Sequence, residues 1–272
     1  MNPFAKRLQD RAAGTLFGTW LSSTSALFAE AAGYAGFDWA VVDMEHAPMD
    51  MGTLVQSLQA TLGSTMVPIV RVPWNDSVTV KRVLDAGAET VLFPFVQDEH
   101  EAARAVAATR YPPLGVRGMA GMNRGSRFGT APDHFTSAND RMGVIVQLET
   151  PQALARLEAI AQVPGVDAIF IGPADLSGTM GWPGQLDHPD VEAAMVEAAR
   201  RAHAVGSHVG TVVGTVERVQ RFCDAGYDYV GLASELGLFM RAATDALKVL
   251  RAGTPAQPGP AAADRPPRPG RQ

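Results

Sequence analysis

The stretch Phe37-Asp38-Trp39-Ala40-Val41-Val42-Asp43-Met44-Glu45-His46-Ala47-Pro48 decides the fold, because an apolar run leads directly into three acid or base side chains. Its first six residues have the length and β-branched content of a buried strand. The polar residues Asp43, Glu45 and His46 then fall where that strand leaves the core. In α/β proteins, binding and catalytic sites are built at such strand ends. The stretch therefore predicts an α/β fold with a site after this strand.

The same strand-then-helix pattern recurs along the chain. Strands are predicted over 15–20, 37–42, 67–72, 90–94, 144–149, 166–171, 208–213 and 229–232. Helices are predicted over 25–32, 51–62, 98–108, 152–161, 191–204, 216–225 and 236–250, with one more between the cap at 75–77 and Gly87. Short, continuously apolar strands indicate a parallel sheet buried on both faces. Eight such units in about 250 residues favour a closed (β/α)8 TIM barrel over an open sheet.

The domain organisation follows from the same pattern. Residues 1–251 are predicted to form a single barrel domain. Residues 252–272 are rich in Pro, Gly and Ala without apolar periodicity, which predicts a disordered tail. The segment 111–140 interrupts the pattern and is predicted to be a long irregular loop, a type that is usually functional or at an interface.

Composition excludes several classes of function. The chain has 272 residues, 46% of them hydrophobic, so it can bury a large core without disulfides. The only cysteine, Cys223, has no partner for an internal disulfide, which indicates a reducing compartment. A net charge of -5 argues against nucleic acid as a partner. No apolar run approaches the ~20 residues of a membrane span, so we expect a cytoplasmic protein.

Polar residues recur at the predicted strand ends. They are Asp43, Glu45, His46, Arg71, Gln147, Glu149 and Asp175. In a parallel barrel all strand C-termini meet at one mouth. Any one of these residues alone would more often be part of a salt bridge at the rim. Together they predict a polar site, because unpaired charge is poorly tolerated in a core.

The residue types suggest the chemistry of that site. Glu149 and Asp175 could bring two hard oxygen ligands to one Mg²⁺ or Mn²⁺ ion. Arg71 offers a planar donor fork for a carboxylate or a developing enolate oxygen. Histidine is the one residue type in this set with an unperturbed pKa near neutrality, which makes His46 the candidate general base. A metal, an anion clamp and a base together indicate proton or carbon removal next to a carbonyl group.

The lysines distinguish two mechanisms of carbon–carbon cleavage. The chain contains only Lys6, Lys81 and Lys248, and none falls at a predicted strand end. A Schiff-base aldolase requires a lysine inside the barrel. The pattern therefore favours metal-dependent enolate chemistry.

Several motifs resemble the HpcH/HpaI family of class II pyruvate aldolases. They are Val42-Asp43-Met44-Glu45-His46-Ala47-Pro48, Arg71-Val72-Pro73, Asp85-Ala86-Gly87-Ala88, Tyr111-Pro112-Pro113 with Gly115-Val116-Arg117-Gly118, Gln147-Leu148-Glu149-Thr150 and Phe170-Ile171-Gly172-Pro173-Ala174-Asp175-Leu176-Ser177. The resemblance covers about residues 10 to 250 in order. It implies a metal-dependent lyase with a barrel fold.

The resemblance also implies roles for the strand-end residues. Glu149 and Asp175 would bind a divalent metal ion (Mg²⁺, Mn²⁺ or Co²⁺), which pyruvate would chelate. Arg71 would stabilise the enolate, and both Arg71 and Asp175 would contact substrate. His46, acting through a bound water, would be the base.

Further residues receive supporting roles from the resemblance. Gln147 and the backbone at Ala174 would contact substrate, and Asp43 would support the catalytic groups. Asp85 would raise the basicity of His46. However, Asp85 ends the helix after the third strand, and a helix leaving the mouth should end at the opposite face. An aspartate at that position is alternatively a structural cap or a member of an ion pair. The family role would then require that Asp85 reach the site of a neighbouring subunit.

The resemblance implies a homo-oligomer, a trimer or hexamer. Met44 and the stretch Met119-Ala120-Gly121-Met122 depart from the family pattern and leave the aldehyde preference open. The predicted reaction is reversible cleavage of a 4-hydroxy-2-oxo acid into pyruvate and an aldehyde. The alternatives are a CoA-ester lyase of the citrate-lyase β-subunit type and a non-catalytic barrel subunit.

Overall fold

The computed structural model describes residues 1–10 and 14–252. The chain divides into two compact units, Met1–Gly237 and Leu238–Gln272. The first unit contains the whole barrel, and the second contains most of the last helix. The predicted domain boundary between residues 251 and 252 stays a prediction. Of the expected tail, residues 253–272 lie outside the described residues.

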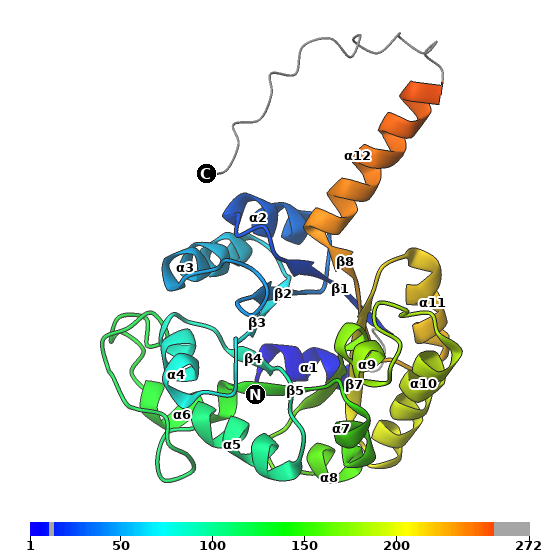
Figure 1. The fold of residues 1–272 in the computed structure, drawn as a ribbon. Helices are drawn as coiled ribbons and strands as arrows, with labels where there is room; N and C mark the ends of the chain where they lie inside the picture. Colours follow the sequence, from blue (N-terminus) through cyan, green and yellow to red (C-terminus); the bar gives the residue numbers. More distant parts are fainter. Residues whose placement is uncertain (11–13, 253–272) are drawn as a thin grey trace, which may run out of the picture. The chain divides into compact units, whose positions relative to one another are not determined.

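Eight parallel strands close into a barrel in sequence order, which confirms the predicted (β/α)8 architecture (Figure 1). The strands are β1 (Leu16–Leu21), β2 (Trp39–Asp43), β3 (Val67–Arg71), β4 (Thr90–Phe93), β5 (Gly143–Leu148), β6 (Ala168–Ile171), β7 (His208–Val213) and β8 (Tyr229–Ser234). Closure is made by β1 and β8, where Leu16 pairs with Tyr229. All eight C-terminal strand ends therefore meet at one mouth.

Helices connect the strands. They are α1 (Pro3–Gln9), α2 (Ala26–Tyr34), α3 (Met51–Ala60), α4 (Ser77–Asp85), α5 (Glu99–Thr109), α6 (His134–Arg141), α7 (Pro151–Ala155), α8 (Leu157–Ala161), α9 (Pro173–Thr179), α10 (Pro189–Ala204), α11 (Val216–Asp224) and α12 (Glu235–Ala252), with a 3₁₀ turn at Thr61–Gly63. Side-chain caps start several of them; Asp76, for example, accepts the backbone N–H groups of Val78 and Thr79. Among the described residues no helix is long and apolar enough to cross a membrane.

Three helical details differ from the sequence prediction. The helix predicted over 152–161 is two short helices, because Arg156 leaves helical geometry between them. Helix α6 occupies part of the segment predicted to be an irregular loop. Helix α9 starts at Pro173, directly after β6, where Gly172-Pro173 suggested only a strand exit. Proline is well suited to the first turn of a helix, since it needs no N–H partner there.

Aromatic side chains fill the interior of the barrel. Trp39 and Tyr229 are fully buried and pack edge to face with ring centroids 5.5 Å apart, and Phe4 of α1 packs on Tyr229 at 5.2 Å. Two strand glycines make this possible: a Cβ at Gly18 would lie 2.2 Å from the Trp39 ring, and one at Gly210 would lie 2.2 Å from Tyr229. With the interior filled, the space for a ligand is at the mouth.

Candidate active site

A cavity of about 390 Å³ opens at the mouth of the barrel. Its lining includes Asp43, His46, Arg71, Gln147, Glu149, Ala174 and Asp175. Side chains from β2, β3, β5 and the start of α9 therefore converge as the strand-end pattern predicted. A larger cavity, of about 540 Å³, lies elsewhere and is described below.

Asp43 and Arg71 form a buried ion pair across β2 and β3. Nε of Arg71 donates to Oδ1 of Asp43 at 2.9 Å and Nη2 donates to Oδ2 at 2.6 Å. The two residues are register partners in the sheet, so the pairing follows from strand alignment. The guanidinium carbon also lies 5.2 Å from the ring centroid of Trp20. Arg71 is thus held rigidly, with its charge at the cavity.

The loop after β2 is organised by the same aspartate. Oδ1 of Asp43 accepts the backbone N–H groups of Glu45 at 3.0 Å and His46 at 3.4 Å. The imidazole Nε2 of His46 lies 3.7 Å from Oε2 of Glu45, and the His46 side chain is 65% exposed. Oε2 of Glu45 also lies 3.1 Å from Nη1 of Arg71. Burial raises the pKa of Glu45, and the charges of Arg71 and His46 oppose that rise.

Glu149 is a deeply buried carboxylate of the site, with 2% exposure, the same as Asp43. Oε1 accepts the backbone N–H of Phe95 at 2.8 Å, and Oε2 accepts Nε2 of Gln147 at 2.6 Å. Burial raises the pKa of Glu149 to about 7; the two hydrogen bonds oppose the rise, and the charges of Asp175 and Glu45 add to it. Phe95 has φ +56°, a strained conformation for a non-glycine residue, and this conformation presents its N–H to Glu149.

Asp175 lies in the first turn of α9 and is exposed at the cavity next to Ala174. The hydroxyl of Thr179 is within hydrogen-bonding distance of the carbonyl oxygens of Glu149 and Asp175, at 3.1 and 2.8 Å. Thr179 is the last residue of α9, so this contact holds the end of the helix against Glu149, the residue directly after β5. The short helix that the sequence did not predict therefore positions a predicted site residue.

The residues present fit a divalent cation of the Mg²⁺ type. Glu149 and Asp175 are close enough for the charge of one to raise the pKa of the other, which a cation between them would relieve. Oε1 of Gln147 is buried without a hydrogen-bond partner, so a hard oxygen atom is left over at the same place. A Cβ at Gly172 would lie 2.4 Å from Oε2 of Glu149, so this glycine leaves room for the carboxylate.

The protein ligands alone would not complete such a site. Within residues 1–10 and 14–252, no group of three or more His, Cys, Asp or Glu side chains is arranged to hold a metal ion. Two carboxylates are typical of Mg²⁺ sites in which water and substrate supply the remaining ligands.

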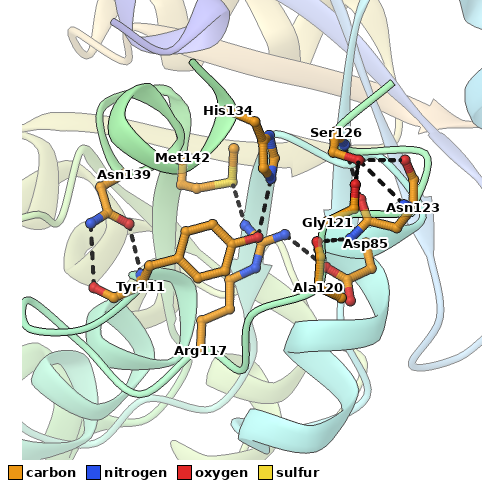
Figure 2. A network of polar contacts seen from close by, with 10 residues as sticks. All are labelled: Asp85, Tyr111, Arg117, Ala120, Gly121, Asn123, Ser126, His134, Asn139 and Met142. Atoms are coloured by element: carbon orange, nitrogen blue, oxygen red, sulfur yellow. Dashed lines mark hydrogen bonds and ion pairs between the residues drawn. The ribbon is translucent and has the colours of Figure 1, made fainter. Parts of the chain in front are cut away.

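Asp85 does not line the mouth cavity. It is the last residue of α4, and its Oδ1 accepts a hydrogen bond of 2.9 Å from Nη2 of Arg117 (Figure 2). Within this chain Asp85 is therefore a member of an ion pair, which was the alternative to its family role. The implied role beside His46 stays a prediction, and it requires an Asp85 from another copy of the chain.

The structure adds residues that the sequence analysis did not select. Trp20 and Ser22 line the cavity at the end of β1, and Ser234 lines it at the end of β8. Glu235 holds the β1 end in place, since its Oε1 accepts the backbone N–H groups of Ser22 and Ser23, both at 2.7 Å. Applying the strand-end rule to the first and last strands would have found the two serines. No local signal identifies Phe95, whose contribution is a backbone conformation.

The closed barrel and the cavity at its mouth, lined by carboxylates, an arginine and a histidine, have the architecture of a (β/α)8 barrel enzyme. Residues 16–242 match the family HpcH/HpaI aldolase/citrate lyase. The chain belongs to this family, which confirms the resemblance seen in the sequence.

Individual relatives indicate the class of reaction more narrowly. The chain is 47% identical to 2-dehydro-3,6-dideoxy-6-sulfogluconate aldolase of Pseudomonas putida over 86% of this chain and 92% of that protein. It is 44% identical to 5-keto-4-deoxy-D-glucarate aldolase of Salmonella arizonae over 85% of this chain and 90% of that protein. A crystal structure of an HpcH/HpaI aldolase/citrate lyase family protein from Burkholderia cenocepacia matches with TM-score 0.88 and 39% identity, covering 92% of this chain and 100% of that one. These relatives confirm the carbon–carbon lyase class and favour an aldolase over the citrate-lyase alternative.

Proposed function

We propose that this protein is a divalent-metal-dependent aldolase that cleaves a 4-hydroxy-2-oxo acid of the sugar-acid type into pyruvate and an aldehyde. One observation carries the proposal: Glu149, Asp175, Arg71 and His46 line a single cavity at the barrel mouth. The named relatives act on sugar-acid derivatives, which supports this substrate class for the present chain.

Glu149 and Asp175 are the residues that would hold the cation. When bound, a divalent ion supplies Lewis-acid polarisation of the 2-oxo group. Gln147 keeps Glu149 oriented through the 2.6 Å hydrogen bond from its Nε2, and its Oε1 has no hydrogen-bond partner. We propose Mg²⁺, Mn²⁺ or Co²⁺ as the ion.

Arg71 supplies hydrogen bonds to the charge that develops on substrate. A guanidinium has five N–H donors. Two of them bind Asp43 and a third faces Glu45, which leaves two for a carboxylate or enolate oxygen. Because the Asp43 pair fixes the guanidinium before substrate arrives, little reorganisation is needed when the enolate forms.

His46 is the proposed base. In cleavage it takes the proton of the C4 hydroxyl, the new C4 carbonyl forms as the C3–C4 bond breaks, and the bonding electron pair passes into the enolate of pyruvate. His46 then gives this proton to C3 of the enolate, which releases pyruvate and restores the neutral imidazole. Oε2 of Glu45 lies 3.7 Å from Nε2 of His46, so a carboxylate stands beside the imidazole that carries the proton during this step.

The test is pyruvate release from a panel of 4-hydroxy-2-oxo acids, measured by coupling to lactate dehydrogenase. We expect turnover with Mg²⁺, Mn²⁺ or Co²⁺ and its loss in EDTA. Cleavage that persists in EDTA, or covalent trapping of pyruvate on the enzyme by borohydride, would contradict the proposal. Turnover of acyl-CoA substrates with none of free 2-oxo acids would instead support a CoA-ester lyase, and a Glu149→Ala variant unchanged in every property would support a non-catalytic subunit.

We also propose that the protein is cytoplasmic and forms a trimer or hexamer. The oligomer would bring a neighbouring Asp85 within reach of His46, which would reconcile the family role of Asp85 with its contacts in this chain. Sedimentation of the full-length protein measures the assembly directly.

A further inference from the structure

A second cavity lies around the N-terminal ends of β3, β4 and β5, away from the residues of the mouth, and has a volume of about 540 Å³. Its lining contains four arginines, one histidine and one acidic residue. They are Arg117, Arg124, Arg127, Arg141, His134 and Glu89. A volume of this size suits a small-molecule ligand.

The charges of this basic cavity do not balance. Arg117 is paired with Asp85 at 2.9 Å, and Nε of Arg141 lies 3.6 Å from Oε1 of Glu89. Arg124 and Arg127 have no ion-pair partner among the described residues. Four guanidinium groups against two carboxylates leave two positive charges uncompensated. Burial lowers the pKa of Arg124, and no neighbouring carboxylate opposes that effect.

Three buried polar atoms in the cavity wall lack hydrogen-bond partners, and they are Nε of Arg117, Nδ1 of His134 and Nε of Arg141. Arg117 is 2% exposed, and its Nε has no hydrogen-bond acceptor. His134 is 5% exposed, and its Nδ1 has no partner, while Nε2 lies 3.1 Å from the hydroxyl of Tyr111 (Figure 2). Buried polar groups without partners are uncommon and destabilising, so their presence in one wall points to a missing ligand group.

The wall itself is held in place by specific contacts. The Arg117 guanidinium lies 4.4 Å from the ring centroid of Tyr111, between that ring and Asp85 (Figure 2). Nη1 of Arg124 donates to the carbonyl oxygen of Ala86 at 3.0 Å. A Cβ at Gly87 would lie 2.4 Å from the same Nη1, so only glycine leaves this space to the arginine. The cationic groups are therefore positioned by the fold.

We propose that this basic cavity is a second ligand site that binds a small oxyanion with two negative charges, a phosphate or a dicarboxylate. Arg124 and Arg127 are its accessible cationic groups, and the wall of Arg117 and His134 supplies further donors. With Tyr111 donating to Nε2, the neutral imidazole of His134 carries its proton on Nδ1 and can donate to the anion. The proposal does not depend on the reaction at the mouth.

The test is calorimetric titration of the full-length protein with inorganic phosphate and, separately, with succinate, at low ionic strength. The metal and pyruvate are kept saturating, so that the mouth is occupied throughout. The variants are R124Q/R127Q and, as a control that removes one arginine charge on α5, R104Q. We expect saturable binding to wild type and R104Q, and affinity lower by at least about tenfold in R124Q/R127Q, because charge-assisted hydrogen bonds are lost.

The two probes distinguish the source of the anion. Binding of phosphate alone assigns the site to phosphorylated ligands, and binding of succinate alone assigns it to dicarboxylates. If the double variant is unstable, R127Q, which removes an exposed side chain, should still weaken binding by several-fold. The proposal is overturned if neither probe binds wild type saturably, or if R124Q/R127Q binds them as well as R104Q does.

Discussion

Two arginine–aspartate pairs, each with a buried guanidinium group, lie at different places in the barrel and have different surroundings. Arg71 pairs with Asp43 at the mouth, and Arg117 pairs with Asp85 at the C-terminal end of α4. Each guanidinium also lies against an aromatic ring, Trp20 in the first case and Tyr111 in the second.

The difference lies in the number of charges around each pair. At the mouth the pair is bidentate, and three more carboxylates, Glu45, Glu149 and Asp175, lie nearby. Around Arg117 the hydrogen bond is single, Nε is unpartnered, and three more arginines share the cavity. The same type of ion pair therefore occurs in two opposite settings. Asp43 and Arg71 belong to an acidic site that suits a cation, and Asp85 and Arg117 lie at a basic cavity that suits an anion. The following predictions test this contrast.

The largest expected effect is at Glu149. Glu149→Gln keeps the shape of the side chain and removes the charge that would hold the cation, so pyruvate release should fall by about 10³-fold or more. Calorimetry with Mn²⁺ should show a matching loss of binding, while circular dichroism stays unchanged. Full activity in this variant would remove Glu149 from the site.

The second effect separates the two arginines. Arg71→Lys retains a positive charge but cannot make the bidentate contact with Asp43, so pyruvate release should fall by about 10²-fold. The matched change Arg117→Lys keeps a positive charge beside Asp85 and lies outside the mouth cavity, so it should alter turnover of the folded protein by no more than about threefold. Equal losses of pyruvate release in both variants would contradict the different roles assigned to the two pairs.

The third effect concerns stability. Asp85→Asn leaves Arg117 as a buried charge without a counter-ion, so the free energy of unfolding in urea should fall by about 3 kcal/mol. If Asp85 also acts on His46 of a neighbouring chain, the acid limb of the activity–pH profile should move in the same variant. Unchanged stability would mean that the Arg117 pair contributes nothing to the fold.

The smallest effect is a pH dependence of cation binding. The pKa of Glu149 is about 7 in the folded protein, against an ordinary value of 4.5, and burial is the main cause. In the cation-free protein, protonated Glu149 contributes to the free energy of unfolding. This contribution is complete below pH 4.5 and is lost as the pH rises through about 7. A cation must displace the proton, so Mn²⁺ affinity should rise about tenfold from pH 6 to pH 8. Calorimetry at the two pH values measures this, and a flat profile would contradict the raised pKa.

Much of the fold could be predicted from local patterns. The apolar run ending at Val42 is a strand in the structure, and the caps and glycines around Asp76 and Gly87 mark a helix where one is found. The failures were also local: α9 was missed because Gly172-Pro173 suggests a chain break as readily as a helix start. Such ambiguity is resolved by packing, which a short window of sequence does not contain.

The sequence by itself determined the barrel and the strand-end positions of the site, because strand length, apolar runs and caps are properties of neighbouring residues. Only the tertiary structure decided which of these positions interact. Arg71 meets Asp43 through strand register, and Glu149 acquires its raised pKa through burial and through Asp175 on another element. The basic cavity is likewise a product of folding, since it joins Arg124 to residues of α6 and strand starts far apart in the chain. Distances and burial between remote segments exist only once the barrel has closed.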